Sequence, residues 1–94
     1  MDKEQWTVYI IQAKNGNLYT GITKDLSKRL ANHHKGKTGA RFFRFSAPEA
    51  VVFQEQHYSN RSQAMKRENE IKKMTRKQKN TLIANWNQHR HSDI

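Results

Sequence analysis

The chain has 94 residues, and its 18 Lys and Arg outnumber its 8 Asp and Glu to give a formal net charge of +10. This length is typical of one domain, and so large a positive excess indicates a polyanionic partner: RNA, DNA or, less often, an anionic membrane. The absence of cysteine excludes disulfides and thiolate metal sites. No apolar run approaches the roughly 20 residues of a membrane span, and the N-terminal residues show no signal-peptide pattern. We therefore expect a cytoplasmic protein that does not enter a membrane.

The first two predicted elements are β-strands joined by a tight turn. Residues 6–13 and 17–23 are rich in β-branched and aromatic side chains, which is typical of strands. Between them, Lys14-Asn15-Gly16 is a hairpin signal.

The length of this turn decides which side chains share a face of the sheet. A two-residue loop would pair Tyr9 with Ile22 and would put Tyr9 and Tyr19 on opposite faces. A three-residue loop, with Gly16 left-handed in a bulge, pairs Tyr9 with Gly21 and brings the two tyrosines to one face. We favour the three-residue loop because it leaves the other face uniformly apolar. That apolar face comprises Trp6, Val8, Ile10, Leu18 and Ile22.

A helix is predicted from Asp25 to about residue 35, with Thr23 as its N-cap. Its inner stripe consists of Leu26, Leu30 and either His33 or His34. A basic, aromatic connection follows over residues 35–46, and Pro48 precedes a third strand predicted over residues 50–56.

Two more helices complete the predicted chain. The patterns Asn60-x-x-Gln63 and Thr75-x-x-Gln78 resemble capping boxes and predict helices over residues 60–74 and 75–88. The inner face of the last helix contains Leu82, Ile83 and Trp86. The order β-β-α-β-α-α predicts an α+β fold, a three-stranded sheet flanked by helices. We expect a single domain over residues 1–94, with its core in residues 6–83 and a frayed tail over residues 89–94.

Glu68 interrupts an apolar stripe of the helix predicted over residues 60–74. Helical spacing places it with Ala64, Ile71 and either Met65 or Met74. An acid in such a stripe is costly unless it is paired or binds a cation. One interpretation is a structural ion pair with a nearby Lys or Arg. The other, equally weighted by the pattern, is a ligand for a hard cation such as Mg²⁺, completed by substrate phosphate and water.

Arg29 lies at the edge of the inner stripe of the preceding helix, and His33 follows one turn later. Taken alone, Arg29 is more often a solvated residue and His33 a structural histidine. The functional alternative is a clamp on phosphate oxygens, because the planar guanidinium matches them. His33 would then be a proton shuttle or a hydrogen-bond donor beside the clamp.

Tyr9 and Tyr19 are ordinary strand aromatics when each is considered alone. Two tyrosines side by side, opposite the better apolar face, are less ordinary because a phenol can pass a proton to or from an attacking water. To act as a base, a phenol needs its pKa lowered by nearby positive charge.

Together these residues form an ordered pattern. It runs Thr7-Val8-Tyr9, Tyr19-Thr20-Gly21, Arg29 and Ala64-x-x-x-Glu68-x-x-Ile71-Lys72. This pattern resembles the GIY-YIG nuclease superfamily over about residues 6–83 and, more narrowly, its small single-domain bacterial proteins of the UPF0213 type. Tyr-x-Gly by itself is a weak signal, whereas the ordered set with these spacings is fairly specific.

The resemblance implies a three-stranded antiparallel sheet and hydrolysis of a phosphodiester with one divalent ion, Mg²⁺ or Mn²⁺, held by Glu68. It implies that Tyr9 or Tyr19 helps to activate the water and that Arg29 steadies the phosphate in the transition state. His33 matches a position that is histidine in some members and tyrosine in others. Asn80 matches by spacing an asparagine that many members use, although helical phase puts it off the inner face of the last helix.

Two positions depart from the family pattern. Thr7 stands where the first motif has its leading glycine, and Thr20 stands where the second has isoleucine. These positions are structural in the family, so we still expect the family fold. The departures leave open that the enzyme is degenerate or weak.

Basic side chains predict how a nucleic acid would be held. Our candidates are Lys35, Lys37, Arg41, Arg44, Lys66, Arg67, Lys72, Lys73 and Arg76. A charge run is usually a solvated face, but its position beside Glu68 favours a phosphate track. The interleaved residues Phe42, Phe43 and Phe45 fit either base stacking or core packing. Nothing resembles a base-reading element, so we expect binding of low sequence specificity that weakens with salt.

Two functions remain open from the sequence. The first is a metal-dependent endonuclease, with DNA as the expected substrate and RNA not excluded, acting as a monomer. The second is a nucleic-acid-binding module whose nuclease site is vestigial.

Overall fold

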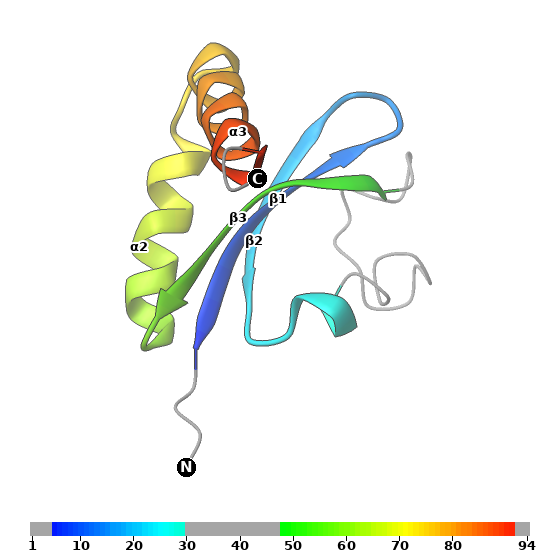
Figure 1. Cartoon of the computed structure of the whole chain (residues 1–94). Helices are drawn as coiled ribbons and strands as arrows, with labels where there is room; N and C mark the ends of the chain where they lie inside the picture. The colour runs from blue at the N-terminus through cyan, green and yellow to red at the C-terminus, as the bar shows by residue number, and fades with distance from the viewer. Residues whose placement is uncertain (1–4, 30–47, 92–94) are drawn as a thin grey trace.

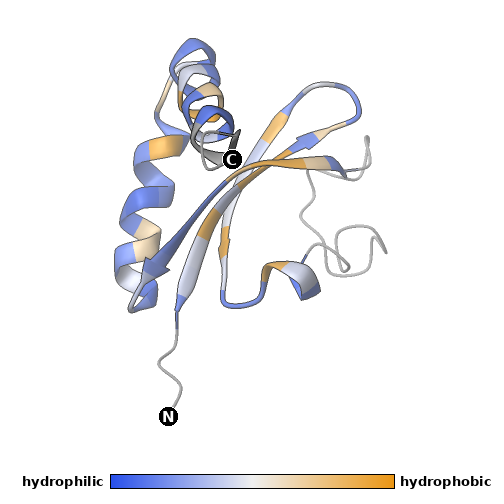
Figure 2. Ribbon diagram, viewed as in Figure 1, coloured by the Kyte–Doolittle hydropathy of each residue, from blue (hydrophilic) through white to orange (hydrophobic). Residues whose placement is uncertain are grey.

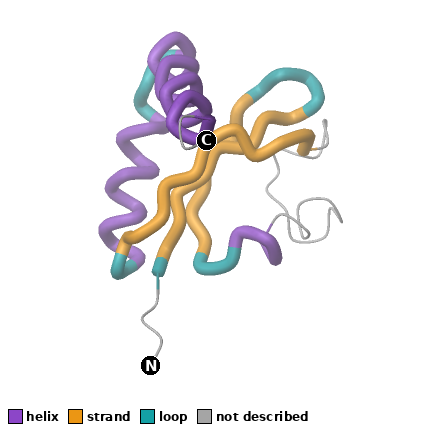
Figure 3. The backbone as a smooth tube through the Cα atoms, in the orientation of Figure 1, coloured by secondary structure: helices purple, strands orange, loops and turns teal. Residues whose placement is uncertain are grey.

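The structure, a computed structural model, describes residues 5–29 and 48–91. An antiparallel sheet in the order β2-β1-β3 contains β1 (Trp6–Ala13), β2 (Leu18–Thr23) and β3 (Pro48–Tyr58). The helices α2 (Arg61–Lys72) and α3 (Arg76–His91) pack on one face of this sheet, α2 mainly across β1 and β2 and α3 against β3 (Figure 1). A helical turn at residues 26–29 follows β2 on the side away from α2 (Figure 3). The predicted α+β fold with its order β-β-α-β-α-α is confirmed.

The hairpin between β1 and β2 has the predicted three-residue loop. Tyr9 pairs with Gly21, and Ile11 pairs with Tyr19. Gly16 is left-handed, with φ of +92°, and its amide donates to the carbonyl of Ala13 at 2.8 Å. A glycine adopts this conformation without the steric penalty of a side chain, so Gly16 sets the register that brings the two tyrosines to one face.

The third strand is longer than predicted, since it covers residues 48–58 instead of 50–56. Its register against β1 shifts in three places, and between Trp6 and Val8 it carries one extra residue. His57 in this bulge has φ of +88°, a left-handed conformation that is uncommon for a side chain of its size. Pro48 is tolerated because it begins an edge strand, where a missing amide hydrogen costs little.

An ion-pair network fastens the end of β3 to α2. The hydroxyl of Tyr58 donates to Glu55 Oε1 at 2.6 Å, and Arg67 Nε donates to the same oxygen at 2.8 Å. Arg67 Nη1 also donates to Glu70 at 3.0 Å. Burial, followed by the hydrogen bond to Glu55, raises the pKa of Tyr58 to about 12. These contacts hold the strand end beyond the bulge against the helix.

Both N-caps predicted for α2 and α3 form, but only one of the two predicted capping boxes closes. Asn60 accepts from the amide of Gln63 at 2.9 Å, although the Gln63 side chain bonds Ser59 and does not close the box. At α3 the box is reciprocal, because Thr75 accepts from the amide of Gln78 while the Gln78 side chain accepts from the amide of Thr75. Each helix therefore begins where its cap satisfies amides that lack a partner within the helix.

The N-cap predicted for the first helix is wrong. The carboxylate of Asp25 accepts from the amide of Lys28 at 3.1 Å, and the carbonyl of Asp25 accepts from Arg29. Thr23 instead accepts from the amide of Asp25, which closes a turn before the helix. Asp25 is the N-cap, because its short carboxylate reaches the third amide of the first turn.

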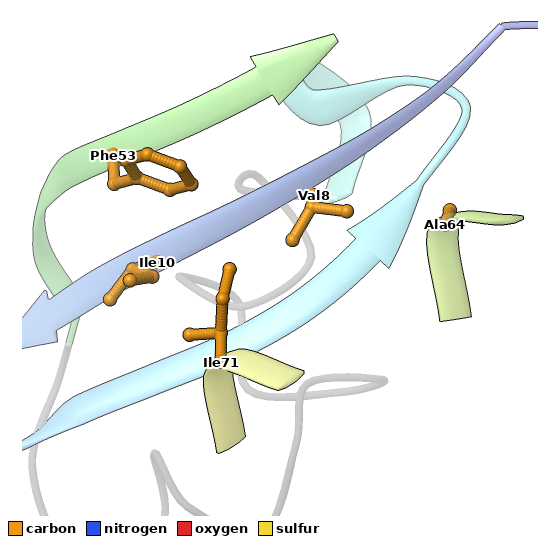
Figure 4. Packing of buried hydrophobic residues seen from close by; sticks show 5 residues of the cluster. All are labelled: Val8, Ile10, Phe53, Ala64 and Ile71. Carbon is orange, nitrogen blue, oxygen red and sulfur yellow. The ribbon is translucent and has the colours of Figure 1, made fainter. Parts of the chain in front are cut away.

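The core lies between the sheet and the two helices. Its fully enclosed cluster contains Val8, Ile10, Phe53, Ala64 and Ile71, and in Figure 4 the side chain of Ile71 points at the strands between Val8 and Ile10. The predicted inner face of α3 packs against this cluster. The helices are otherwise hydrophilic and the strands carry most of the apolar residues (Figure 2). Among the described residues, no helix is both long and apolar enough to cross a membrane.

Candidate active site

Tyr9 and Tyr19 lie side by side on the face of the sheet that turns away from α2 and α3. Val8 and Ile10 point into the core between sheet and helices, so strand alternation directs Tyr9 to the opposite face. The ring centroids of Tyr9 and Tyr19 are 6.3 Å apart, with planes tilted by 49°. Tyr9 is fully buried, whereas Tyr19 is half-buried. The second tyrosine of the pair is therefore the one within reach of a ligand.

Gly21 makes room for Tyr9. A Cβ at this position would come 2.6 Å from the Tyr9 hydroxyl oxygen, 2.7 Å from its Cζ and 3.2 Å from Tyr19 Cε2. The phenol of Tyr9 thus lies directly over the glycine of the opposite strand. The last residue of the Tyr19-Thr20-Gly21 motif is required by contact and not by backbone conformation.

Arg29 joins the two tyrosines from the helical turn that follows β2. Its guanidinium donates hydrogen bonds to both phenols, and the bond to Tyr9 is the main cause that raises the pKa of Arg29 above its ordinary value. Arg29 Nε is buried and has no hydrogen-bond partner among the described residues. A buried donor without a partner is uncommon in native structures, and an oxygen of a bound ligand is one way to satisfy it.

The pKa of Tyr9 does not suit a general base. Burial raises its pKa to about 12, and the charges of Tyr19 and Glu68 add to this, while the hydrogen bond and the charge of Arg29 act in the opposite direction. Since burial prevails, Tyr9 does not meet the condition of a lowered pKa that a phenol needs to act as a base. At neutral pH its hydroxyl keeps its proton.

Glu68 lies on the buried stripe of α2, as predicted from helical spacing. Ala64 and Ile71 on either side are fully buried, and the Glu68 side chain is 15% exposed. Its Oε2 pairs with Lys72 Nζ at 3.3 Å, so the structural ion pair that we weighed does form. Its negative charge also contributes to the raised pKa of Tyr9, so it acts on the tyrosine site from α2.

The donor set at Glu68 is compatible with a hard cation. Over residues 5–29 and 48–91, no three His, Asp or Glu side chains gather into a metal-binding cluster. One carboxylate with phosphate and water oxygens is an accepted way to hold Mg²⁺, and Lys72 engages only Oε2. Glu68 is therefore the residue that would hold a cation.

Several predicted site residues fall outside the described part of the chain. These are His33, Lys35, Lys37, Arg41 and Arg44. Their roles remain predictions.

The basic residues of α2 and α3 divide into two groups. Lys66 and Lys73 are exposed. Arg67 is held by Glu55 and Glu70, which gives it a structural role and removes it from our phosphate track. Lys72 pairs with Glu68, and Arg76 Nη2 donates to the carbonyl of Gly16 at 3.0 Å, which fastens α3 to the hairpin.

Asn80 lies away from the tyrosine face. It is exposed on α3, and its Oδ1 accepts from Arg76 Nε at 3.3 Å. This agrees with its helical phase, which placed it off the inner face of α3.

A cleft beside Arg29 contains residues that our sequence interpretation missed. Its volume is about 320 Å³, and it is lined by Trp6, Ile22, Thr23, Lys24, Asp25, Lys28 and Arg29. Lys24 and Lys28 flank the cap residue Asp25 and precede Arg29, so a basic cluster around the helix start was the available signal. That Trp6 lies beside this basic cluster could not be predicted without the pairing register of β1 and β2.

A family model described as the GIY-YIG catalytic domain matches residues 5–81. The chain therefore belongs to the GIY-YIG family.

Within that family the chain is similar to UPF0213 proteins. It is 45% identical to UPF0213 protein SERP0126 of Staphylococcus epidermidis over 83 residues, which cover 88% of this chain and 96% of that protein. It is 40% identical to UPF0213 protein DP2720 of Desulfotalea psychrophila over 82 residues, covering 87% of this chain and 74% of that protein. The solution NMR structure of the UPF0213 protein BH0048 from Bacillus halodurans matches with a TM-score of 0.54 and 34% identity, covering 85% of this chain and 83% of that one.

Proposed function

We propose that this protein is a metal-dependent endonuclease that hydrolyses phosphodiester bonds in DNA with low sequence specificity. The observation that carries the proposal is the convergence of Tyr9, Tyr19 and Arg29 from three segments, with Glu68 acting on Tyr9 from a fourth. Family membership supports a nuclease, and the net charge of +10 supports a polyanionic substrate.

Arg29 is suited to hold the phosphate. Its guanidinium is oriented by the two phenols, and its Nε has no partner within residues 5–29 and 48–91. Hydrolysis of a phosphodiester increases the negative charge on the phosphate oxygens, so a fixed cation there lowers the barrier. Removing one such electrostatic contact typically costs on the order of 10²–10³ in rate.

The two tyrosines take different parts in this proposal. Attack of water on phosphorus forms one P–O bond and breaks another, while the water loses a proton and the leaving oxygen gains one. Tyr9 is fully buried and accepts a hydrogen bond from Arg29, so it positions the guanidinium that holds the phosphate. Tyr19 is less buried and is our candidate to orient the attacking water by a hydrogen bond, while solvent takes the proton that this water loses.

Glu68 would hold one divalent cation, Mg²⁺ or Mn²⁺. When bound, that cation supplies Lewis-acid neutralisation of a phosphate oxygen. The residues of this chain orient the substrate around it: Arg29 holds the phosphate and Lys72 fixes the rotamer of Glu68 through their ion pair.

The test is cleavage of labelled single-stranded, duplex and branched DNA with Mg²⁺ or Mn²⁺ by the wild type and by Glu68→Gln. We expect the variant to lose on the order of 10²–10³ in rate while it binds DNA as before. Glu70→Gln is the matched control, because Glu70 is two residues away, 64% exposed and paired only on the surface with Arg67. Cleavage that survives Glu68→Gln would identify a contaminant and overturn the proposal.

A second candidate is a nucleic-acid-binding module that no longer cleaves. The ion pair between Lys72 and Glu68 and the complete burial of Tyr9 favour it. Binding of all three DNA forms without cleavage under either metal would establish this alternative.

A further inference from the structure

The cleft beside Arg29 has the composition of a nucleotide-binding site. Lys24, Lys28 and Arg29 contribute three positive charges to its lining, and Trp6 and Ile22 contribute an apolar wall. Its volume of about 320 Å³ lies at the lower end of the roughly 300–1,000 Å³ typical of small-molecule sites. This size suits a ligand such as one nucleotide.

Trp6 fixes the position of one of these charges. Lys24 Nζ lies 5.5 Å from the centroid of the Trp6 ring, within the range of a cation–π interaction. Trp6 itself is half-buried and packs against the core cluster, so it is a rigid wall. The contact with the Trp6 ring therefore holds the ammonium of Lys24 at the cleft.

Asp25 is the one acidic residue of the lining and is occupied by a structural role. Its carboxylate accepts from the amide of Lys28 as the N-cap of the helical turn. The lining therefore keeps an excess of positive charge, and the cap holds Lys28 at a defined place on the first turn.

Arg29 connects this cleft to the candidate active site. Arg29 is one of the residues that line the cleft, and its guanidinium donates to Tyr9 and Tyr19. If the scissile phosphate of a polynucleotide lies at Arg29, the neighbouring nucleotides must lie on the surface beside it. The cleft is a basic, concave surface next to Arg29.

We propose that Trp6, Lys24 and Lys28 form a subsite for the nucleotide next to the phosphodiester bond that Arg29 holds. Lys24 and Lys28 bind the flanking phosphate, and the indole of Trp6 contacts the sugar or base. The inference rests on the proposed function for its substrate class, but it concerns residues that the catalytic set does not include.

Binding without turnover tests this subsite. The full chain is titrated, with EDTA and no divalent ion, into a fluorescently labelled short single-stranded DNA over a range of salt concentrations. Each of Lys24→Ala and Lys28→Ala is expected to weaken binding about tenfold and to reduce the slope of log K against log salt by about 0.7. Lys14→Ala removes the same charge in the hairpin turn, at the opposite end of β1 from Trp6, and should leave the slope unchanged.

The contribution of Trp6 is measured with the same assay. Trp6→Leu should weaken binding, and in its background Lys24→Ala should cost less than in the wild type because the ammonium is no longer oriented. Circular dichroism shows whether Trp6→Leu folds. A DNA with one abasic nucleotide should bind the wild type more weakly than the intact strand, and that difference should shrink in Trp6→Leu.

The outcomes separate this inference from the proposed function. If the lysine variants bind like Lys14→Ala while the wild type cleaves DNA, the subsite is wrong and the nuclease stands. If they lose affinity as expected and the wild type never cleaves, the subsite stands and the nuclease is wrong. If both hold, the variants should raise KM and leave kcat unchanged.

Discussion

The two faces of β1 are equally buried but differ in chemistry. Val8 and Ile10 face α2 and α3, Tyr9 and Ile11 face the other way, and all four are fully buried. The helix-facing side is almost entirely apolar, as expected for a packed core. The other side contains a protonated phenol and a guanidinium whose buried Nε has no hydrogen-bond partner among the described residues.

This difference separates stability from chemistry within one strand. The helix-facing side gains free energy from apolar burial, at roughly 25 cal/mol per Å². The tyrosine-facing side keeps polar groups at defined positions, which costs stability and is typical of functional sites. Substitutions on the two sides should therefore differ in which property they change.

The largest expected effect on stability is at Ile71, which points between Val8 and Ile10 (Figure 4). Ile71→Ala should lower the free energy of unfolding by about 2–5 kcal/mol, because it removes buried methyl groups and leaves a cavity. Ile71→Val should cost only about 0.5–1.5 kcal/mol. Urea unfolding measures both. DNA cleavage well below the melting temperature should persist in Ile71→Val, and its loss would show that the two sides are not separable.

The next effect is a dependence on pH that comes from Tyr9. The pKa of Tyr9 is about 12 in the folded protein against an ordinary value of 10.0, so between these values the unfolded chain releases a proton that the folded protein keeps. The contribution is fully present below pH 10 and is lost as pH rises toward 12, by about 3 kcal/mol in total. Tyr9→Phe should lack this fall.

Denaturant unfolding of both proteins at pH 9, 10 and 11 isolates the Tyr9 contribution as the difference between their slopes. Tyr58 titrates in both and cancels, although its pKa is also raised to about 12. Parallel slopes would mean that Tyr9 is not the buried, protonated group described above.

Gly21 tests whether the tyrosine side needs its close contact. A Cβ there would collide with the Tyr9 ring, so Gly21→Ala should cost about 1–3 kcal/mol through overpacking. It should also reduce DNA cleavage by more than the loss of folded protein explains, because Tyr9 must move. Gly16→Ala is the matched control: its left-handed φ makes it destabilising, but nothing lies within 4 Å of its Cβ, so cleavage should be retained. Equal cleavage by the two variants would contradict a role for Tyr9 alignment.

The smallest effect concerns the one polar residue on the helix-facing side of β2. Thr20 is 4% exposed, and its hydroxyl is buried without a partner among the described residues. Thr20→Val keeps the shape and removes the orphaned hydroxyl, so it should raise the free energy of unfolding by about 1 kcal/mol. Thr7→Val is the control on the opposite face of the sheet. The Thr7 hydroxyl is not among the buried atoms without a partner, so this substitution should not raise the free energy of unfolding. A destabilised Thr20→Val would reveal a hydrogen bond at Thr20.

Local patterns along the sequence predicted much of this arrangement. The hairpin register followed from the apolar alternation and from Gly16, because only one loop length keeps the apolar face uniform. The capping patterns at Asn60 and Thr75 placed the starts of α2 and α3 since they act within one helical turn. The helical phase of α2 placed Glu68 among buried residues.

Other features depended on contacts between distant segments. The cap at Asp25 depended on which side chain reached the amide of Lys28, and two neighbouring candidates looked alike. The length of β3 was set by its pairing with β1 through a bulge that no local signal marks. The structural role of Arg67 required Glu55, twelve residues away on a strand.

Tyr9 and Tyr19 show what the sequence could determine and what it could not. Their shared face was determined by the sequence alone, since strand alternation and turn length are local properties of the chain. The protonation of Tyr9 was decided by the tertiary structure, because its burial over Gly21 outweighs the nearby charge of Arg29 and raises its pKa. The sequence thus determined which side chains meet, and packing around Tyr9 decided that it keeps its proton.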